Sequence, residues 1–395
     1  MKKSLCLIVA FALAVAAITG FAASTSAPVK SAKPEPGIRL AQSVTALTGL
    51  AISPLLGVSV YGAWEYFQTP SEKKAQLSFY AKPWFWIFGF LIVAMVVAKD
   101  ALGTVIPSPL KKPFDVAELF ENKLSGLVAA GALVPMVSTF LGTKSVDVAI
   151  SLSAAGFAAA DGMSLGAILV LPFAMVAYTF VWLASHAITI LILLSPWGVF
   201  DAALKAFRAS LLAAVAGLGA IDPWLGAILS LGVILVAYLV GGWSFRLLVQ
   251  GSVFGWDFLT RRRNRFVPTG GEHWAFTSRK IDKIPIRTYG RLMKNSAGGL
   301  LFRYRPWLFL TEKELSLSGK FAVGNGFIYP TLELCDVEDE TQWFSFPPRY
   351  RTHEEALAGI YGLEVRDVGL LGGIKKIGYW FRELFGYHTA TSSTA

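Results

Sequence analysis

Long apolar stretches separated by short polar segments fill most of the chain before residue 256. A helix needs about 20 apolar residues to cross the hydrocarbon core of a bilayer, so each long stretch predicts a membrane span. Two candidates are short, and one of them, Phe207–Ile221, could instead form a re-entrant hairpin. The pattern predicts a membrane α-helical bundle of about five to seven transmembrane helices over residues 43–256. The predicted spans are Ser43–Trp64, Trp84–Ile106, Leu124–Gly142, Val146–Ala160, Leu165–Leu194, Phe207–Ile221 and Trp224–Val249.

The first residues have the pattern of a secretory signal peptide. Lys2 and Lys3 precede the apolar run Leu5–Ile18, and small residues follow. A basic segment, an apolar run and small residues together are typical of a cleavable signal. We expect a signal peptide at residues 1–22, with an uncleaved signal anchor as the alternative, and an exposed, proline-containing tether at residues 23–42.

The charged residues indicate both location and orientation. Only 16% of residues are charged and 54% are apolar, whereas soluble domains carry about 25% charged residues. Cytoplasmic segments next to a membrane collect Lys and Arg. We therefore expect a bacterial inner (plasma) membrane protein with its mature N-terminus outside and its C-terminus in the cytoplasm. In this topology Lys111–Lys123 is an external loop, and its lysines are an exception to the enrichment of basic residues on the cytoplasmic side. The residues that decide the orientation follow the last span: Arg261, Arg262, Arg263 and Arg265.

Ionisable residues at membrane depth are candidates for function, because each costs a few kcal/mol to bury in lipid. His186 lies well inside Leu165–Leu194, and Asp100, Asp147 and Asp161 lie near the ends of predicted spans. A path for protons or ions could use His186 with one of these carboxylates. Alternatively, His186 forms a hydrogen bond to a neighbouring helix and the aspartates lie at helix ends.

No motif points to catalysis. Residues 162–166 fit G-x-S-x-G, but that motif needs a preceding strand and a nearby base. Here an Ala-rich helical segment precedes it, and His186 lies far along the same predicted helix. The chain has two cysteines and four scattered histidines, so no metal-ligand spacing is present. We expect no catalytic, metal or cofactor site, and no enzyme activity.

Beyond residue 257 the pattern changes to that of a small α+β, β-rich domain, expected at residues 257–350 and in the cytoplasm. Short apolar and aromatic runs separated by Gly-containing turns predict strands. A helix is expected from Thr352 to Tyr361, with acids in its first turn. Residues 351–395 are expected to hold C-terminal helices and a disordered tail. The predicted strands are Leu300–Leu310, Glu314–Leu317, Phe327–Leu334 and Gln342–Phe346.

The C-terminal region is strongly basic. Thr260–Arg305 carries twelve Lys and Arg against two acids, beginning with the arginine cluster that sets the orientation. A later amphipathic segment carries Lys375, Lys376 and Arg382 on its polar face. Such a helix either lies on an anionic membrane surface or packs on the β-rich domain. No nucleic-acid motif accompanies the charge, so anionic lipid of the inner leaflet is the expected partner, with a protein partner also open.

The segment Ala41–Val137 resembles uncharacterised bacterial multi-pass membrane families. Those families have a Gly/Ser-rich first span and a second span that ends in an acid and a proline, here Asp100 and Pro107. The resemblance implies a membrane protein and carries no activity.

Three hypotheses for function follow. The first is a membrane-anchored scaffold whose cytoplasmic module contacts anionic lipid or a protein partner. The second is a transporter or channel with a polar path near His186. The third is a membrane enzyme acting on lipid, for which no catalytic set converges in the sequence.

Overall fold

The computed structural model describes residues 36–102, 108–140, 165–195, 198–260, 266–295, 298–325, 329–335 and 340–366. These residues form two compact units, Met1–Gly241 and Gly242–Ala395 by chain position. The predicted signal peptide, the span Val146–Ala160 and the basic C-terminal helix lie outside the described residues.

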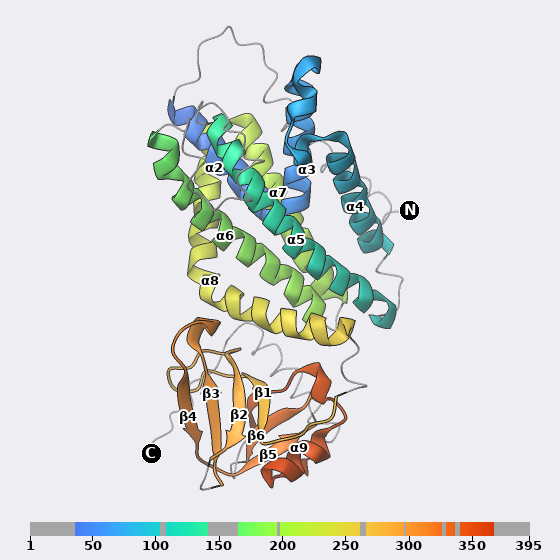
Figure 1. Ribbon diagram of the computed structural model, residues 1–395, viewed down its shortest axis with the longest axis vertical. Helices are drawn as coiled ribbons and strands as arrows, with labels where there is room; N and C mark the ends of the chain where they lie inside the picture. The colour runs from blue at the N-terminus through green and yellow to red at the C-terminus, as the bar shows by residue number, and fades with distance from the viewer. Residues whose placement is uncertain are drawn as a thin grey trace. The chain divides into compact units, whose positions relative to one another are not determined.

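The first unit is helical (Figure 1). Helix α2 packs against α5, α6 and α7, and α3 packs against α4 and α5. Helix α8 begins in this unit and continues into the second. The described helices are α2 (Pro36–Ile52), α3 (Pro54–Gln68), α4 (Pro83–Leu102), α5 (Ser108–Phe140), α6 (Leu165–Leu194), α7 (Gly198–Ile221) and α8 (Pro223–Leu259), with short 3₁₀ turns η1 (Ser71–Gln76) and η2 (Phe79–Ala81).

A break at Ser53 divides the predicted span Ser43–Trp64 into α2 and α3. Ser53 has φ −136° and ψ 83°, which are not helical values. Pro54 cannot donate to the preceding turn and its ring fits the first turn of a new helix, so it ends α2 and starts α3. Helix α2 also begins before Ser43: residues 36–42 of the predicted tether are helical, and Ala41 is buried.

The prediction of a loop at Lys111–Lys123 is wrong. These residues belong to α5, a single helix that continues into the predicted span Leu124–Gly142. Asp115 and Asn122 are buried in the helical unit. Asp115, one of the charges that marked this segment as a loop, therefore faces other helices.

Three described helices are long and apolar enough to cross a membrane: Val170–Leu194 of α6, Gly198–Ile221 of α7 and Pro223–Leu259 of α8. This confirms a helical part with membrane-spanning character, with fewer such helices than the five to seven predicted. The break at Pro54 and the charges of α5 account for two of the differences, and α4 contributes only the shorter apolar segment Pro83–Lys99. Phe207–Ile221, expected as a short span or hairpin, is the end of the full-length helix α7.

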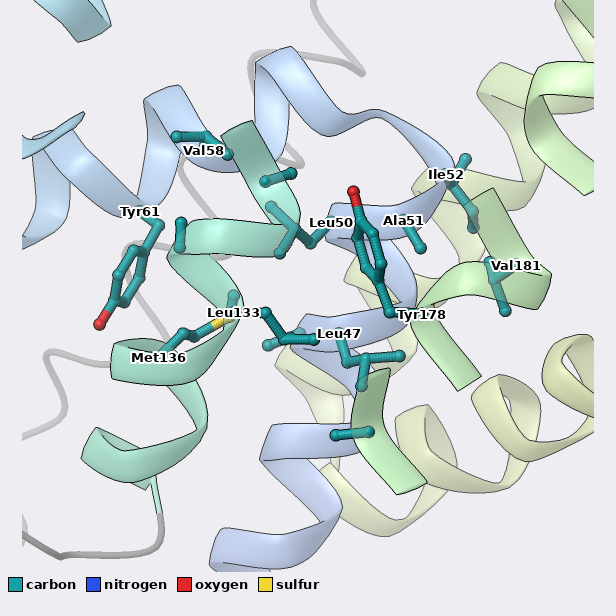
Figure 2. Close-up of a cluster of buried hydrophobic side chains, with 14 of the residues drawn as sticks. Leu47, Leu50, Ala51, Ile52, Val58, Tyr61, Leu133, Met136, Tyr178 and Val181 are labelled. Atoms are coloured by element: carbon teal, nitrogen blue, oxygen red, sulfur yellow. The ribbon is translucent and has the colours of Figure 1, made fainter. Parts of the chain in front are cut away.

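Apolar side chains from several helices form the core of the helical unit. Figure 2 shows Leu47 and Leu50 of α2 converging with Leu133 of α5 and with Tyr178 and Val181 of α6. The Tyr178 hydroxyl donates a hydrogen bond of 2.7 Å to the carbonyl oxygen of Gly126. A buried phenol needs such a partner, so this contact fixes α6 against α5.

The second unit contains a β-sheet next to the end of α8. Its described strands form one eight-stranded sheet in the order β4-β3-β2-β1-β7-β6-β5-β8, and every neighbouring pair is antiparallel except β5–β8. The strands are β1 (Glu272–Thr277), β2 (Tyr289–Lys294), β3 (Leu300–Tyr304), β4 (Lys313–Leu317), β5 (Phe321–Gly324), β6 (Thr331–Cys335), β7 (Glu340–Ser345) and β8 (Glu364–Arg366). The β-sheet region expected at the C-terminal end is confirmed.

One face of the sheet and the short helix α9 (Glu354–Tyr361) enclose the core of this unit. Phe302, Phe344 and Leu332 are fully buried there, and Leu357 packs onto them from α9. Helix α9 begins at Glu354, after His353, rather than at Thr352 as expected. The second unit covers Gly242–Ala395 by chain position and includes α9 and β8.

Candidate functional site

His186 is completely buried among the helices of the first unit. Its Nδ1 lies 3.1 Å from Oδ1 of Asn122 on α5, and its ring stacks on Trp182 at 5.3 Å between centroids. An amide oxygen only accepts hydrogen bonds, so His186 is the donor and its Nδ1 carries the proton. A hydrogen bond from His186 to a neighbouring helix is the alternative that the sequence analysis gave to an ion path.

A second polar contact lies at the break between α2 and α3. The Ile52 carbonyl accepts hydrogen bonds from Arg208 Nε at 3.1 Å, from Arg208 Nη2 at 2.9 Å and from Ser185 Oγ at 2.7 Å. Backbone groups at a helix break in an apolar surrounding need replacement partners. Arg208 of α7 and Ser185 of α6 supply them, so the break is held by two other helices.

A third contact joins α4 to the charged part of α5. The Lys99 ammonium contacts a carboxylate oxygen of Glu118 at 2.5 Å and one of Asp115 at 3.6 Å, and the three side chains are 13%, 11% and 2% exposed. A cation between two buried acids stabilises both charges.

These contacts involve few of the residues singled out from the sequence. Of the intramembrane candidates, only His186 has a described side chain. Asp100 belongs to α4, but its side chain lies outside the described residues, as do Asp147 and Asp161 entirely. The lipid-surface candidates Arg261, Arg262, Arg263, Arg265, Lys375, Lys376 and Arg382 also lie outside them.

The sequence reasoning missed Asn122, Lys99 and Arg208. Polar residues spaced along one helix face, as Asp115, Glu118 and Asn122 are, could have indicated a buried polar stripe on α5. Each of these groups contacts a neighbouring helix, which is how polar side chains join helices in lipid.

The second unit carries an exposed apolar loop between β3 and β4. Trp307, Leu308, Phe309 and Leu310 are 45%, 44%, 77% and 47% exposed. Trp307 and Leu308 both have positive φ, 55° and 67°, a conformation that is strained for side chains of this size. The strained backbone keeps four consecutive apolar side chains at the surface, and we refer to Trp307–Leu310 as the apolar loop.

The apolar loop lies against the first residues of the second unit. The rings of Trp307 and Phe245 are 5.1 Å apart between centroids. A Cβ atom added to Gly242 would lie 3.6 Å from the Trp307 ring. Trp307 therefore packs on the turn of α8 with which the unit begins.

Charged residues, with one more basic than acidic, flank the apolar loop. Arg303 and Arg305 precede it and Lys313 follows it, while Glu314 pairs with Arg303 at 2.8 Å and Glu312 lies 3.8 Å from Arg305. Exposed apolar side chains beside Lys and Arg are typical of surfaces that contact an anionic membrane.

A buried histidine links the sheet to α9. His273 Nδ1 lies 2.7 Å from the Tyr361 hydroxyl, which donates to the Leu292 carbonyl at 2.9 Å. Because Tyr361 uses its hydrogen on Leu292, it accepts one from His273 Nδ1. Nε2 of His273 is buried and has no hydrogen-bond partner among the described residues. Burial lowers the pKa of His273 and raises that of Tyr361.

Lowering the pH from 7.5 to 5 is expected to destabilise the second unit through His273. In the unfolded chain its pKa is about 6.5, whereas burial lowers it in the folded state. The neutral His273 side chain therefore makes its full contribution to the free energy of unfolding above about pH 6.5. This contribution falls as the pH drops toward the folded-state pKa, by at most about 1.4 kcal/mol per pH unit. Hydrogen-exchange protection factors of β1 and β2 amides should fall with pH. The fall should be smaller in His273→Gln, and an equal fall in both proteins would contradict this role.

The described residues contain no group of three or more His, Cys, Asp or Glu side chains that could hold a metal ion. The chain matches no protein-family model, no curated protein and no solved structure. The arguments for function therefore come from the geometry of the chain itself.

Proposed function

We propose that the protein is a membrane-anchored scaffold whose C-terminal unit docks on an anionic bilayer through the apolar loop, at the cytoplasmic face of a bacterial inner membrane. The observation that carries the proposal is the exposure of Trp307–Leu310 on a backbone with two positive φ values. Strain of this kind costs about 1–3 kcal/mol per residue and persists where it has a use. Presenting Phe309 and its neighbours to lipid is such a use.

The length of α8 supports the same proposal. At 1.5 Å per residue, the segment Pro223–Gly241 extends about 28 Å, close to the thickness of a bilayer core. Its large apolar side chains, such as Leu231, Leu235 and Leu239, are exposed. A span that ends near Gly241 brings Gly242 and Phe245 to the interface, and Trp307 packs on both.

Charge supports an anionic rather than a neutral surface. Each Lys or Arg near such a surface contributes about 1 kcal/mol, and Arg305 and Lys313 border the apolar loop. The arginine cluster 261–265 in the sequence supports a cytoplasmic position for this end of α8, because cytoplasmic segments collect basic residues. Scaffolding is preferred to transport because His186, Lys99 and Arg208 each contact a neighbouring helix.

A fluorophore on the apolar loop is expected to enter the bilayer. The full-length chain, with Cys6 and Cys335 replaced by serine, would carry Leu310→Cys labelled with nitrobenzoxadiazole in phosphatidylglycerol nanodiscs. Emission should shift to the blue, and lipids with a doxyl group should quench it. Burial of a phenylalanine contributes roughly 1.5–3 kcal/mol, so adding Phe309→Ser should lower the equilibrium constant for docking tenfold or more.

Val267 provides the matched control, since it is 68% exposed in the same unit. A label at Val267→Cys should remain in water, and Val267→Ser should leave docking unchanged. If emission from the label at position 310 in phosphatidylglycerol nanodiscs is as red-shifted as emission from the label at position 267, the docking proposal is wrong. Protection of the label by a bound protein without quenching by doxyl lipid would point to a protein partner instead and also contradict it.

A further inference from the structure

A basic cleft of about 260 Å³ lies beside the apolar loop in the second unit. We propose that this cleft binds a phosphate group, carried on a lipid headgroup or on a small soluble molecule. The inference goes beyond the docking of the apolar loop and does not depend on it, since a cleft can bind a soluble phosphate without membrane contact.

The lining brings cations together from four separate segments. Arg246 comes from α8, Lys283 and Arg287 from the segment before β2, Arg305 from the loop after β3, and Lys313 from the start of β4. None of the described residues that line the cleft is acidic. Bringing so many like charges together is unfavourable unless an anion joins them, and phosphate oxygens form strong charge-assisted hydrogen bonds with Lys and Arg.

Two of these cations are fixed in the wall. Arg246 Nε donates a hydrogen bond of 2.9 Å to the Ile286 carbonyl, which holds the guanidinium beside the cleft. Arg287 is 2% exposed, and its guanidinium carbon lies 5.7 Å from the centroid of the Trp243 ring. Rigid cations lose little conformational freedom when a ligand binds.

Two lysines of the lining can reach a ligand. Lys283 and Lys313 are exposed, and neither has an ion-pair partner among the described residues. Glu312, next to Lys313 in the sequence, lies 3.6 Å from Arg291 and 3.8 Å from Arg305, which also lines the cleft. Glu312 thus pairs with arginines, and the charge of the two lysines remains available to an anion.

The size and walls of the cleft limit the ligand. Its volume is somewhat below the roughly 300–1,000 Å³ of sites for drug-sized molecules. Tyr304, Trp307 and Phe245 supply aromatic surface beside the cations. A phosphate with a small apolar or glycerol-like substituent fits this combination better than a nucleotide does.

Calorimetric titration of the full-length chain in neutral detergent would test the proposal. The probes are monomeric dihexanoyl phosphatidate, inorganic phosphate and, as the neutral comparison, dihexanoyl phosphatidylcholine. We expect saturable binding of a phosphate probe and none of phosphatidylcholine. Because each lysine supplies a charge-assisted hydrogen bond, Lys283→Gln with Lys313→Gln should weaken binding at least tenfold. Both residues are exposed, so the variant should keep its fold, which its hydrogen exchange would verify.

Lys320→Gln is the matched control, because Lys320 is an exposed lysine of the same unit that does not line the cleft. Binding of phosphatidate alone supports the site with a lipid source, and binding of inorganic phosphate supports it with a soluble source. Absence of saturable binding by either probe would overturn the proposal, as would equal weakening by Lys320→Gln. Docking of the apolar loop is measured separately in nanodiscs, so either proposal can fail alone.

Discussion

Lys99→Ala is expected to destabilise the helical unit by about 3–5 kcal/mol, the usual cost of removing one partner from a buried ion pair. The ammonium of Lys99 contacts the carboxylates of Glu118 and Asp115, and Asp115 is only 2% exposed. Removing the ammonium takes this contact away from both buried acids, which then stay charged at a higher cost or take up protons. The loss should appear as earlier unfolding when dodecyl sulfate is titrated against the protein in a neutral detergent.

Two further variants separate charge from packing. Lys82→Ala changes an exposed lysine of the same unit and should cost less than about 0.5 kcal/mol. Lys99→Met combined with Glu118→Gln removes the cation and one acid together, and it should recover part of the loss. If Lys99→Ala unfolds no earlier than Lys82→Ala, the three side chains contribute little to stability.

The same three residues show where sequence reasoning about the helical unit succeeds and where it fails. Apolar length correctly indicates α6 and α8, because the predicted spans Leu165–Leu194 and Trp224–Val249 are long enough to stand out. It indicates only the end of α7, because Asp201, Lys205 and Arg208 interrupt the apolar pattern at its start. The prediction fails at α5 because the charged residues there were taken to indicate a solvent-exposed loop. Asp115 and Glu118 are one turn apart, and helical spacing places them on one face. Their partner Lys99 belongs to another helix, and a single sequence does not show such a pairing.

In the second unit, the prediction of strands depended on the density of apolar residues. Strands β3, β4, β6 and β7 overlap the predicted runs, but β1 and β2 lie in the basic stretch and were missed. In β1, Glu272 and Trp274 alternate with the buried His273 and Ala275. This alternation is the signal of a half-buried strand, and the excess of Arg and Lys obscured it.

The apolar loop was predicted as part of the strand Leu300–Leu310, and this is wrong beyond Tyr304. Pro306 lacks the N–H that a ladder needs, which could have ended the strand earlier. The positive φ values at Trp307 and Leu308 could not be predicted, because residues of this size rarely adopt them. The basic cleft depends on this turn, together with residues of α8, and so was missed as well.

Asp257→Ala is expected to cost the second unit about 3–5 kcal/mol. Asp257 lies near the end of α8, and its side chain is 1% exposed. Its Oδ2 accepts hydrogen bonds from Arg349 Nε at 2.8 Å and from the Arg349 backbone N–H at 3.3 Å. Removing the carboxylate leaves the Arg349 guanidinium, 8% exposed, buried beside a cavity. Hydrogen exchange of the β7 and α9 amides should become faster in the variant.

A double-mutant cycle would show that the pair, rather than either side chain alone, fixes α8 to the sheet. Asp257→Leu with Arg349→Met replaces both charges by apolar groups, and buried pairs replaced in this way often keep or gain stability. The double variant should therefore be more stable than Asp257→Ala, with a coupling energy of about 1–3 kcal/mol. Strictly additive losses would mean that the two residues act independently. In that case the contact of α8 with the sheet would depend on apolar packing, such as that of Phe254 on Phe276 and Tyr329.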